Sequence, residues 1–123
     1  MTTSVGIDIE EVKRFRSLAR NRTFLNDVFD QPEILYCKSK GNNPQSLAGI
    51  FAAKEAMIKA LSQLADVRYS VSDFVIHHDK KGAPLVKESN RRKAGRLPRG
   101  VVISLSIAHT SSQALAVAIA QKE

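Results

Sequence analysis

The sequence predicts an α+β fold in which a mainly antiparallel sheet packs against one long helix. Residues 101–109 and 114–120 both alternate in polarity or size, and a polar turn between them predicts a hairpin. Residues 45–64 carry apolar side chains at helical spacing. One face of the second strand is all alanine, at positions 114, 116, 118 and 120, so the long helix can approach it closely. The 123 residues have the length of one domain, which we place at 1–123.

The first part of the chain predicts a short strand followed by helices. We expect a strand at 5–9, a helix from 10 to about 19, helical turns at 24–29 and a helix from 32 to about 39. In the first helix, Glu10 and Glu11 are expected in the first turn, where the helix dipole favours acids. A Gly-Asn-Asn-Pro break at 41–44 precedes the long helix.

The second part predicts a further hairpin and a basic loop. We expect a strand at 71–78, a turn at 79–82, a short partner strand starting at 84–86 and a mobile loop over the basic stretch 87–99. In the first of these strands, Phe74 and Ile76 share one face, and Val71 and Val75 share the other.

The charge of the chain points to anionic partners. Lys and Arg total 19 against 12 acids, a net charge of +7, which attracts nucleic acid, anionic membranes, acidic proteins or phosphorylated small molecules. The single Cys37 excludes an internal disulfide and is expected to be a packing residue. No apolar run has the length of a membrane span, and the N-terminus lacks the pattern of a signal peptide. We therefore expect a cytoplasmic protein without a membrane partner.

Two acids and a lysine are the candidates for chemistry. Asp8 lies within an otherwise apolar strand, and Glu55 lies at the edge of the apolar stripe of the long helix, with Lys59 one turn later. One carboxylate from a strand and one from a helix can hold a magnesium ion that also binds phosphates. Two structural alternatives stay open: Glu55 and Lys59 can form a surface ion pair, and Asp8 can cap a helix.

Four motifs together resemble the holo-acyl-carrier-protein synthases, the small single-domain 4′-phosphopantetheinyl transferases. In chain order they are Gly-Ile-Asp-Ile at 6–9 with Arg14-Phe15, Leu-Ala-Gly at 47–49, Phe-Ala-Ala-Lys-Glu-Ala at 51–56 with Lys59, and Ser-Ile-Ala-His-Thr at 106–110. The resemblance covers essentially the whole chain. It implies transfer of the 4′-phosphopantetheine arm of coenzyme A to a serine of an apo acyl carrier protein, which leaves adenosine 3′,5′-bisphosphate.

The resemblance also implies roles for individual residues. Asp8 and Glu55 would be the magnesium ligands, with Lys59 at the diphosphate and His109 close to the coenzyme A phosphates. Glu55 or a metal-bound water would take the proton of the attacking serine. Arg14, on the first helix, would face the acidic carrier protein. From their positions at or just beyond the end of that helix, we also expect Arg20 and Arg22 at this surface. The family forms a ring of three, with active sites and coenzyme A between subunits.

Three positions depart from the family pattern. Ile50 stands where an arginine is usual, Ala108 replaces a residue with a hydroxyl, and residues 62–66 replace a glycine-rich loop. A degenerate member that binds carrier protein or nucleotide without catalysis is therefore one alternative. A nucleic-acid-binding module built on the basic 87–99 stretch is another, but aromatic residues make up 6% of the chain and tryptophan is absent, which disfavours base stacking and nucleic acid as a partner.

Overall fold

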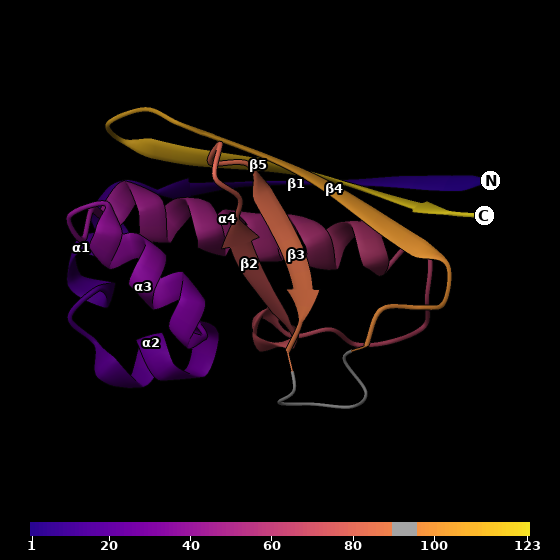
Figure 1. Ribbon diagram of the computed structural model, residues 1–123, viewed down its shortest axis with the longest axis horizontal. Coiled ribbons are helices and arrows are strands. Elements are labelled where there is room, and N and C mark those ends of the chain that lie inside the picture. Colours follow the sequence, from indigo (N-terminus) through magenta and orange to yellow (C-terminus); the bar gives the residue numbers. More distant parts are fainter. Residues whose placement is uncertain (90–95) are drawn as a thin grey trace.

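Three strands form one antiparallel sheet. The computed structural model describes residues 1–89 and 96–123. In sheet order the three strands are β1 (Thr2–Glu11), β5 (Gln113–Lys122) and β4 (Val101–His109) (Figure 1). The expected hairpin of β4 and β5 is confirmed, with Ile107 opposite Ala116. On the other side of β5, Asp8 is also opposite Ala116. Asp8 and Ile107 therefore lie in one row, two strands apart.

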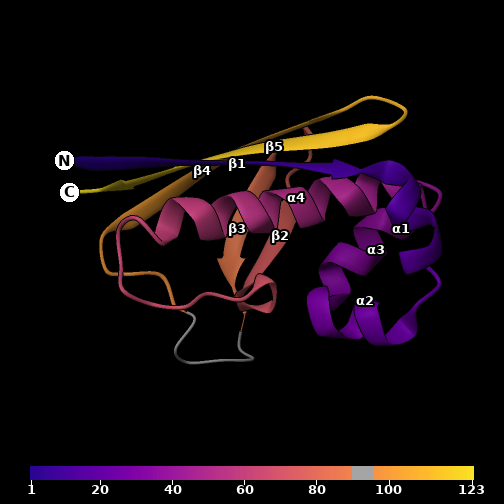
Figure 2. The ribbon, with the colours of Figure 1, turned by 180° about the vertical axis from the view of Figure 1, so that it is seen from behind.

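The long helix α4 (Pro44–Leu61) lies along the inner face of this sheet, as the alanine pattern predicted (Figure 2). Alanines 114, 116, 118 and 120 are fully buried. Gly6 allows the same close approach on β1, because a Cβ there would lie 1.9 Å from the carbonyl oxygen of Ala56. The Ser4 hydroxyl donates a hydrogen bond of 2.7 Å to the carbonyl of Ala60. Residues with small side chains thus set the distance between helix and sheet.

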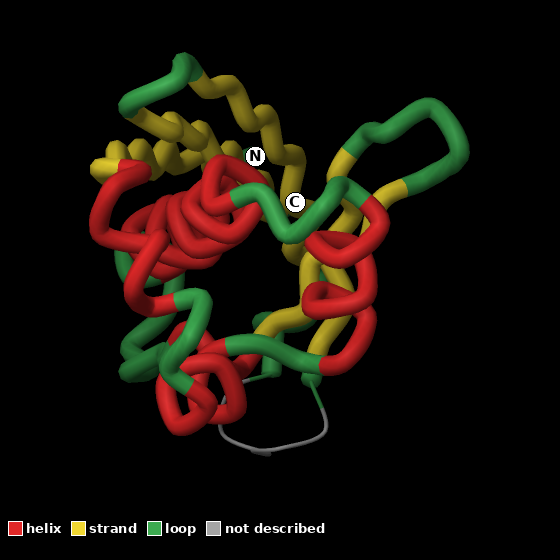
Figure 3. Tube along the Cα trace, turned by 90° about the vertical axis from the view of Figure 1, so that its left-hand side faces the viewer, coloured by secondary structure: helices red, strands yellow, loops and turns green. Residues whose placement is uncertain are grey.

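Three short helices gather at the N-terminal end of α4, the end that Figure 3 faces. They are α1 (Val12–Leu18), α2 (Arg22–Val28) and α3 (Gln31–Ser39). Their core is aromatic: the ring of Phe15 lies 6.2 Å from that of Phe24 and 5.4 Å from that of Phe51. A capping box starts α3, with the Glu33 carboxylate accepting a hydrogen bond from the Asp30 N–H at 2.9 Å.

The boundary between β1 and α1 differs from the prediction. The structure continues β1 through Glu10 and Glu11, which pair with Ala114 and Gln113 of β5, and α1 begins at Val12 with no acid in its first turn. Pairing with a neighbouring strand outweighs the local preference of acids for a helix start. The alternative that Asp8 caps a helix is therefore wrong, because Asp8 lies well inside the strand.

The second hairpin is shorter at its start and longer at its end than expected. Val71–Asp73 form the 3-10 helix η1 rather than strand, because Ser70 and Asp73 cap each other across that turn. The hairpin consists of β2 (Phe74–His78) and β3 (Pro84–Glu88), so the first two residues of the basic stretch are strand. Arg91, Arg92 and Lys93, for which we expected a mobile loop, lie outside the described residues. Likewise, α4 ends at Leu61 rather than near residue 64.

The outer face of the three-stranded sheet is apolar and exposed. Val5, Ile7 and Ile9 of β1 are 53%, 54% and 56% exposed. Ile119 of β5 and Val102 of β4 are exposed on the same face. Within the described residues, no helix or strand covers this face (Figures 1 and 2). None of the helices in that part of the chain is long and apolar enough to cross a membrane.

Candidate functional site

Side chains of α4 form hydrogen bonds with the backbone along the free edge of β1. Gln63 Nε2 donates to the Val5 carbonyl at 2.9 Å, and Lys59 Nζ donates to the Ile7 carbonyl at 2.9 Å. Four helical residues advance about 6 Å, and two strand residues advance about 6.8 Å, so successive helical turns meet alternate strand residues. Glu55, one turn before Lys59, is therefore placed beside residues 8–10 of β1.

Asp8 lies on the inner face of β1, and its side chain contacts Lys59 at this edge. Its Oδ1 accepts a hydrogen bond of 3.3 Å from Lys59 Nζ, and 13% of its side chain is exposed. Its Oδ2 is buried, and no N–H or hydroxyl donor within the described residues reaches it. A buried carboxylate oxygen that no N–H or hydroxyl donor reaches is costly unless it meets a cation or a proton, such as the proton that Glu10 can share with Asp8. Asp8 is therefore suited to hold a cation that approaches from solvent.

Glu10 is a third acid that the sequence analysis missed. The extension of β1 places it two residues after Asp8 on the same face, where Arg14 Nη1 lies 2.8 Å from its Oε1. Burial raises the pKa of Glu10 to about 7, helped by a hydrogen bond to Asp8, by the charge of Asp8 and, more weakly, by Glu55, while Arg14 opposes the rise. The signal available in the sequence was the i, i+2 spacing of Asp8 and Glu10, which only a longer strand makes relevant.

Glu55 completes the acidic side of the site. Burial raises the pKa of Glu55, and the charge of Asp8 raises it further, whereas Lys59 and Arg14 lower it. Within the described residues, no group of three or more His, Cys, Asp or Glu side chains is arranged to hold a metal ion by itself. Two carboxylates can supply part of the oxygen shell of Mg²⁺ and leave positions for water and phosphate oxygens, which is its usual binding mode beside phosphates. Asp8 and Glu55 fit that pattern.

The three arginines expected at a partner surface are exposed, but they are not equivalent. Arg14 is 53% exposed and pairs with Glu10, and its guanidinium lies 5.6 Å from the centroid of the Phe51 ring. Arg20 follows the end of α1, and Arg22 is the first residue of α2. Arg14 thus belongs both to the surface of α1 and to the border of the acidic site, whereas Arg20 and Arg22 lie farther along the chain.

The structure places His109 on the other flank of α4 from Glu55 and Lys59. His109 ends β4 and, with Gln45 and Ile50 of α4, lines a cavity of about 190 Å³. Ile50 precedes Glu55 by five residues, which is about 140° around the helix axis at 100° per residue. Within one chain, the two residues predicted to contact the cofactor, Lys59 and His109, therefore lie on different sides of the long helix.

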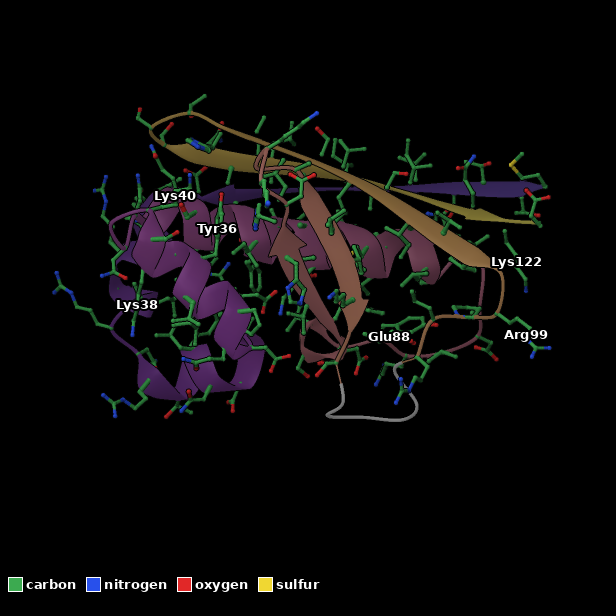
Figure 4. The ribbon with its side chains drawn as sticks, viewed as in Figure 1. Tyr36, Lys38, Lys40, Glu88, Arg99 and Lys122 are labelled. Atoms are coloured by element: carbon green, nitrogen blue, oxygen red, sulfur yellow. The ribbon has the colours of Figure 1, made fainter. Side chains whose placement is uncertain are left out.

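Two stacked rings form another wall of this cavity. The imidazole of His78 at the end of β2 lies parallel to the ring of Tyr36, at 3.6 Å and an interplanar angle of 4°. Figure 4 shows Tyr36 on the side of α3 that faces the β2–β3 hairpin. Burial lowers the pKa of His78, and the charge of Lys40 lowers it further. Ile50 adds an apolar surface, while Ala108 is exposed on the outer face of β4 and takes no part in the cavity.

Comparisons with known proteins agree on one family. The family model described as the 4′-phosphopantetheinyl transferase superfamily matches residues 4–120. A holo-[acyl-carrier-protein] synthase of Caldicellulosiruptor bescii is 45% identical over 123 residues, which cover 99% of this chain and all of the relative. Among solved structures, the ACPS–CoA complex of Chronobacterium ammoniagenes is similar with a TM-score of 0.82 and 26% identity, covering 100% of this chain and 99% of that one. The holo-[acyl-carrier-protein] synthase of Helicobacter pylori in complex with coenzyme A has a TM-score of 0.76 and 32% identity, over 95% of this chain and 99% of that one.

Proposed function

The chain belongs to the 4′-phosphopantetheinyl transferase superfamily, and from this premise we propose that it converts an apo acyl carrier protein to the holo form. It transfers the 4′-phosphopantetheine group of coenzyme A to a serine hydroxyl and leaves adenosine 3′,5′-bisphosphate. The relatives named holo-[acyl-carrier-protein] synthase support this activity over nearly the full length of the chain. The observation that carries the proposal is the hydrogen bond of Lys59 to Asp8 across the edge of β1, with Glu55 close enough for the charge of Asp8 to raise its pKa.

Asp8 and Glu55 would hold a magnesium ion. The buried Oδ2 of Asp8, which no N–H or hydroxyl donor in the described part of the chain reaches, supports this assignment, as does the preference of Mg²⁺ for carboxylate oxygens. When bound, Mg²⁺ neutralises charge on the diphosphate of coenzyme A.

The remaining chemistry falls to side chains of this edge. Lys59 Nζ, on a side chain that is 53% exposed, can reach the diphosphate and stabilise charge on the departing phosphate. The serine Oγ forms a bond to the phosphorus that carries the pantetheine arm, and the bond from that phosphorus to the bridging oxygen breaks. The serine proton passes to Glu55 in this proposal, and the raised pKa of Glu55 supports that role.

We further propose that the cofactor site is shared between copies of the chain. Lys59 and the His109 cavity lie on different flanks of α4, so a coenzyme A molecule that uses both would take them from neighbouring subunits. The exposed apolar outer face of the sheet is a suitable surface for self-association. A closed ring provides such shared clefts, and the resemblance to holo-acyl-carrier-protein synthases specifies three subunits.

The carrier protein would approach α1 through Arg14, Arg20 and Arg22. The net charge of +7 suits this partner and coenzyme A, because both are anionic and charge steering raises the encounter rate. We place the reaction in the cytoplasm, where a reducing environment keeps the unpaired Cys37 as a thiol. Neither a membrane nor a nucleic acid takes part in this proposal.

Intact mass measurement tests the proposed activity. The protein is incubated with coenzyme A, Mg²⁺ and a panel of apo carrier proteins, and we expect one of them to gain the mass of phosphopantetheine. Glu55→Gln should abolish the gain while the fold and carrier binding remain, and Glu88→Gln, on the separate two-stranded sheet, is the matched control. No gain with any carrier would support the degenerate member instead. A rate near that of the unmodified protein for Glu55→Gln at saturating Mg²⁺ would make Glu55 an ordinary surface acid.

A further inference from the structure

A second charged pair lies away from the acidic edge, deep between α3 and α4. Glu33 and Lys54 are both completely buried, and Lys54 Nζ lies 2.7 Å from Glu33 Oε1. Lys54 Nζ also donates to the carbonyl of Val28 at 2.7 Å. The other carboxylate oxygen of Glu33 accepts a hydrogen bond of 2.8 Å from the Ile76 N–H of β2. One carboxylate therefore connects α3, α4 and β2.

Stability alone does not explain such a pair. The cost of removing two charges from water offsets most of their attraction, and apolar replacement of a buried pair is often neutral or stabilising. What the pair does provide is a fixed geometry, because Glu33 and Lys54 must meet in one arrangement for each to be satisfied.

Each element joined by the pair also supplies a wall of the cavity that His109 lines. On α3, Tyr36 is one turn after Glu33, and on α4, Ile50 is one turn before Lys54. On β2, His78 is two residues after Ile76, on the same face of the strand. Tyr36, Ile50 and His78 all line the cavity. Glu33, Lys54 and Ile76 thus each lie one helical turn or two strand residues from Tyr36, Ile50 and His78, respectively.

We propose that the Glu33–Lys54 pair is a positioning element for this cavity. It holds the Tyr36–His78 stack at a fixed separation from Ile50, so that the cavity admits the nucleotide end of coenzyme A. The identity of that ligand rests on the proposed function, but the mechanical role of the pair does not.

Kinetics of a charge-free variant test the role. Glu33→Gln combined with Lys54→Met removes both charges together and keeps the side-chain volumes similar, so no unpaired charge stays buried. We expect KM for coenzyme A to rise about tenfold or more, because the cavity walls are displaced. We expect kcat and KM for the carrier protein to stay within about twofold, because the acidic edge is unaffected. Cys37→Ala, a buried change on α3 that leaves the pair intact, is the control for general loss of packing.

A ligand-free measurement separates this proposal from the proposed function. The NMR signals of the His78 ring protons report stacking on Tyr36, and Tyr36→Leu supplies the unstacked reference. We expect the double variant to shift those signals toward the reference and Cys37→Ala to leave them in place. If the double variant does not fold, Glu33→Met combined with Lys54→Met is used, which also leaves no buried charge, and the same shift is expected. Unchanged His78 signals, or an unchanged KM for coenzyme A in a folded variant, overturn the positioning role. Absence of any transfer by the unmodified protein overturns the proposed function, and the NMR comparison still decides the role of the pair.

Discussion

Gly6→Ala tests how closely α4 must approach β1. The added Cβ would lie 1.9 Å from the Ala56 carbonyl oxygen and 2.8 Å from the Ala60 nitrogen. A close carbon–oxygen contact is about 3.3 Å, so the helix must withdraw by about 1.4 Å. Overpacking costs about 1–3 kcal/mol and occasionally more, and the atoms met here are backbone, which cannot rotate away. We therefore expect a loss of about 3 kcal/mol in the free energy of unfolding.

The same displacement should damage the site more than the fold. A withdrawal of α4 moves Glu55 and Lys59 away from Asp8, and a misplacement of about 1 Å can cost about 100-fold in rate. Urea unfolding followed by circular dichroism gives the stability, and transfer is measured at a temperature where the variant is fully folded. We expect both losses in the same variant.

Gly49→Ala is the matched control on the same sheet-facing side of α4, where the helix contacts β4 instead of β1. A Cβ there would meet the Cγ2 methyl of Ile107 at 3.0 Å, a side-chain contact that needs a shift of only a few tenths of an ångström. Alanine is also favoured over glycine inside a helix by about 1 kcal/mol, so we expect stability equal to or above that of the unmodified protein. If Gly6→Ala unfolds at the same urea concentration as the unmodified protein and keeps its transfer rate, the inferred contact between β1 and α4 is wrong.

Three other predictions concern the partner surface, assembly and the thiol. Arg14→Ala should raise KM for the carrier protein severalfold with little effect on KM for coenzyme A, and higher salt should mimic it; a change confined to the coenzyme A dependence would contradict the placement of α1. Ile7→Asp should place a charge on the outer sheet face and yield monomers by light scattering, and a fully active, stable monomer of the unmodified protein would argue against the ring. Burial raises the pKa of Cys37 to about 12 from its ordinary 9.0, so its thiolate fraction at pH 8 falls about 1000-fold. Iodoacetamide should accordingly modify the urea-unfolded protein at least that much faster, and equal rates would mean that the thiol is accessible.

Strictly alternating patterns were sufficient to predict the central contact of the fold. The alanines at 114, 116, 118 and 120 made the long helix the natural candidate to cover that face, because small side chains let a helix approach closely. Asp8 was recognisable because a carboxylate within an apolar strand is unusual, although the sequence left open that it caps a helix. Both signals are local, so they survive without knowledge of the tertiary structure.

The missed features depend on partners that are distant in sequence. Glu10 was assigned to a helix because only the register with β5 extends β1 to Glu11. Lys54 stands directly before Glu55, and we interpreted this segment only through Glu55 as a metal ligand. No residue near Lys54 in the sequence indicates that it pairs with Glu33 in the interior. His109 and Lys59 are separated because α4 lies between them on the sheet. None of the sequence motifs indicates this position of α4.

The contacts of Lys59 and Gln63 with β1 also bear on solubility. β1 is an edge strand, and the unpaired carbonyls of an edge can recruit a strand from another molecule and start an open-ended aggregate. Here the Val5 and Ile7 carbonyls are already occupied by side chains of α4. Lys59, which we propose binds phosphate, thus also protects the exposed edge of β1 from pairing with a strand of another molecule. Replacing Lys59 with an apolar residue would remove a charge from the reaction. It would also leave unpaired backbone carbonyls beside the apolar outer face. Loss of soluble yield and loss of turnover would therefore both follow from the absence of Lys59 Nζ.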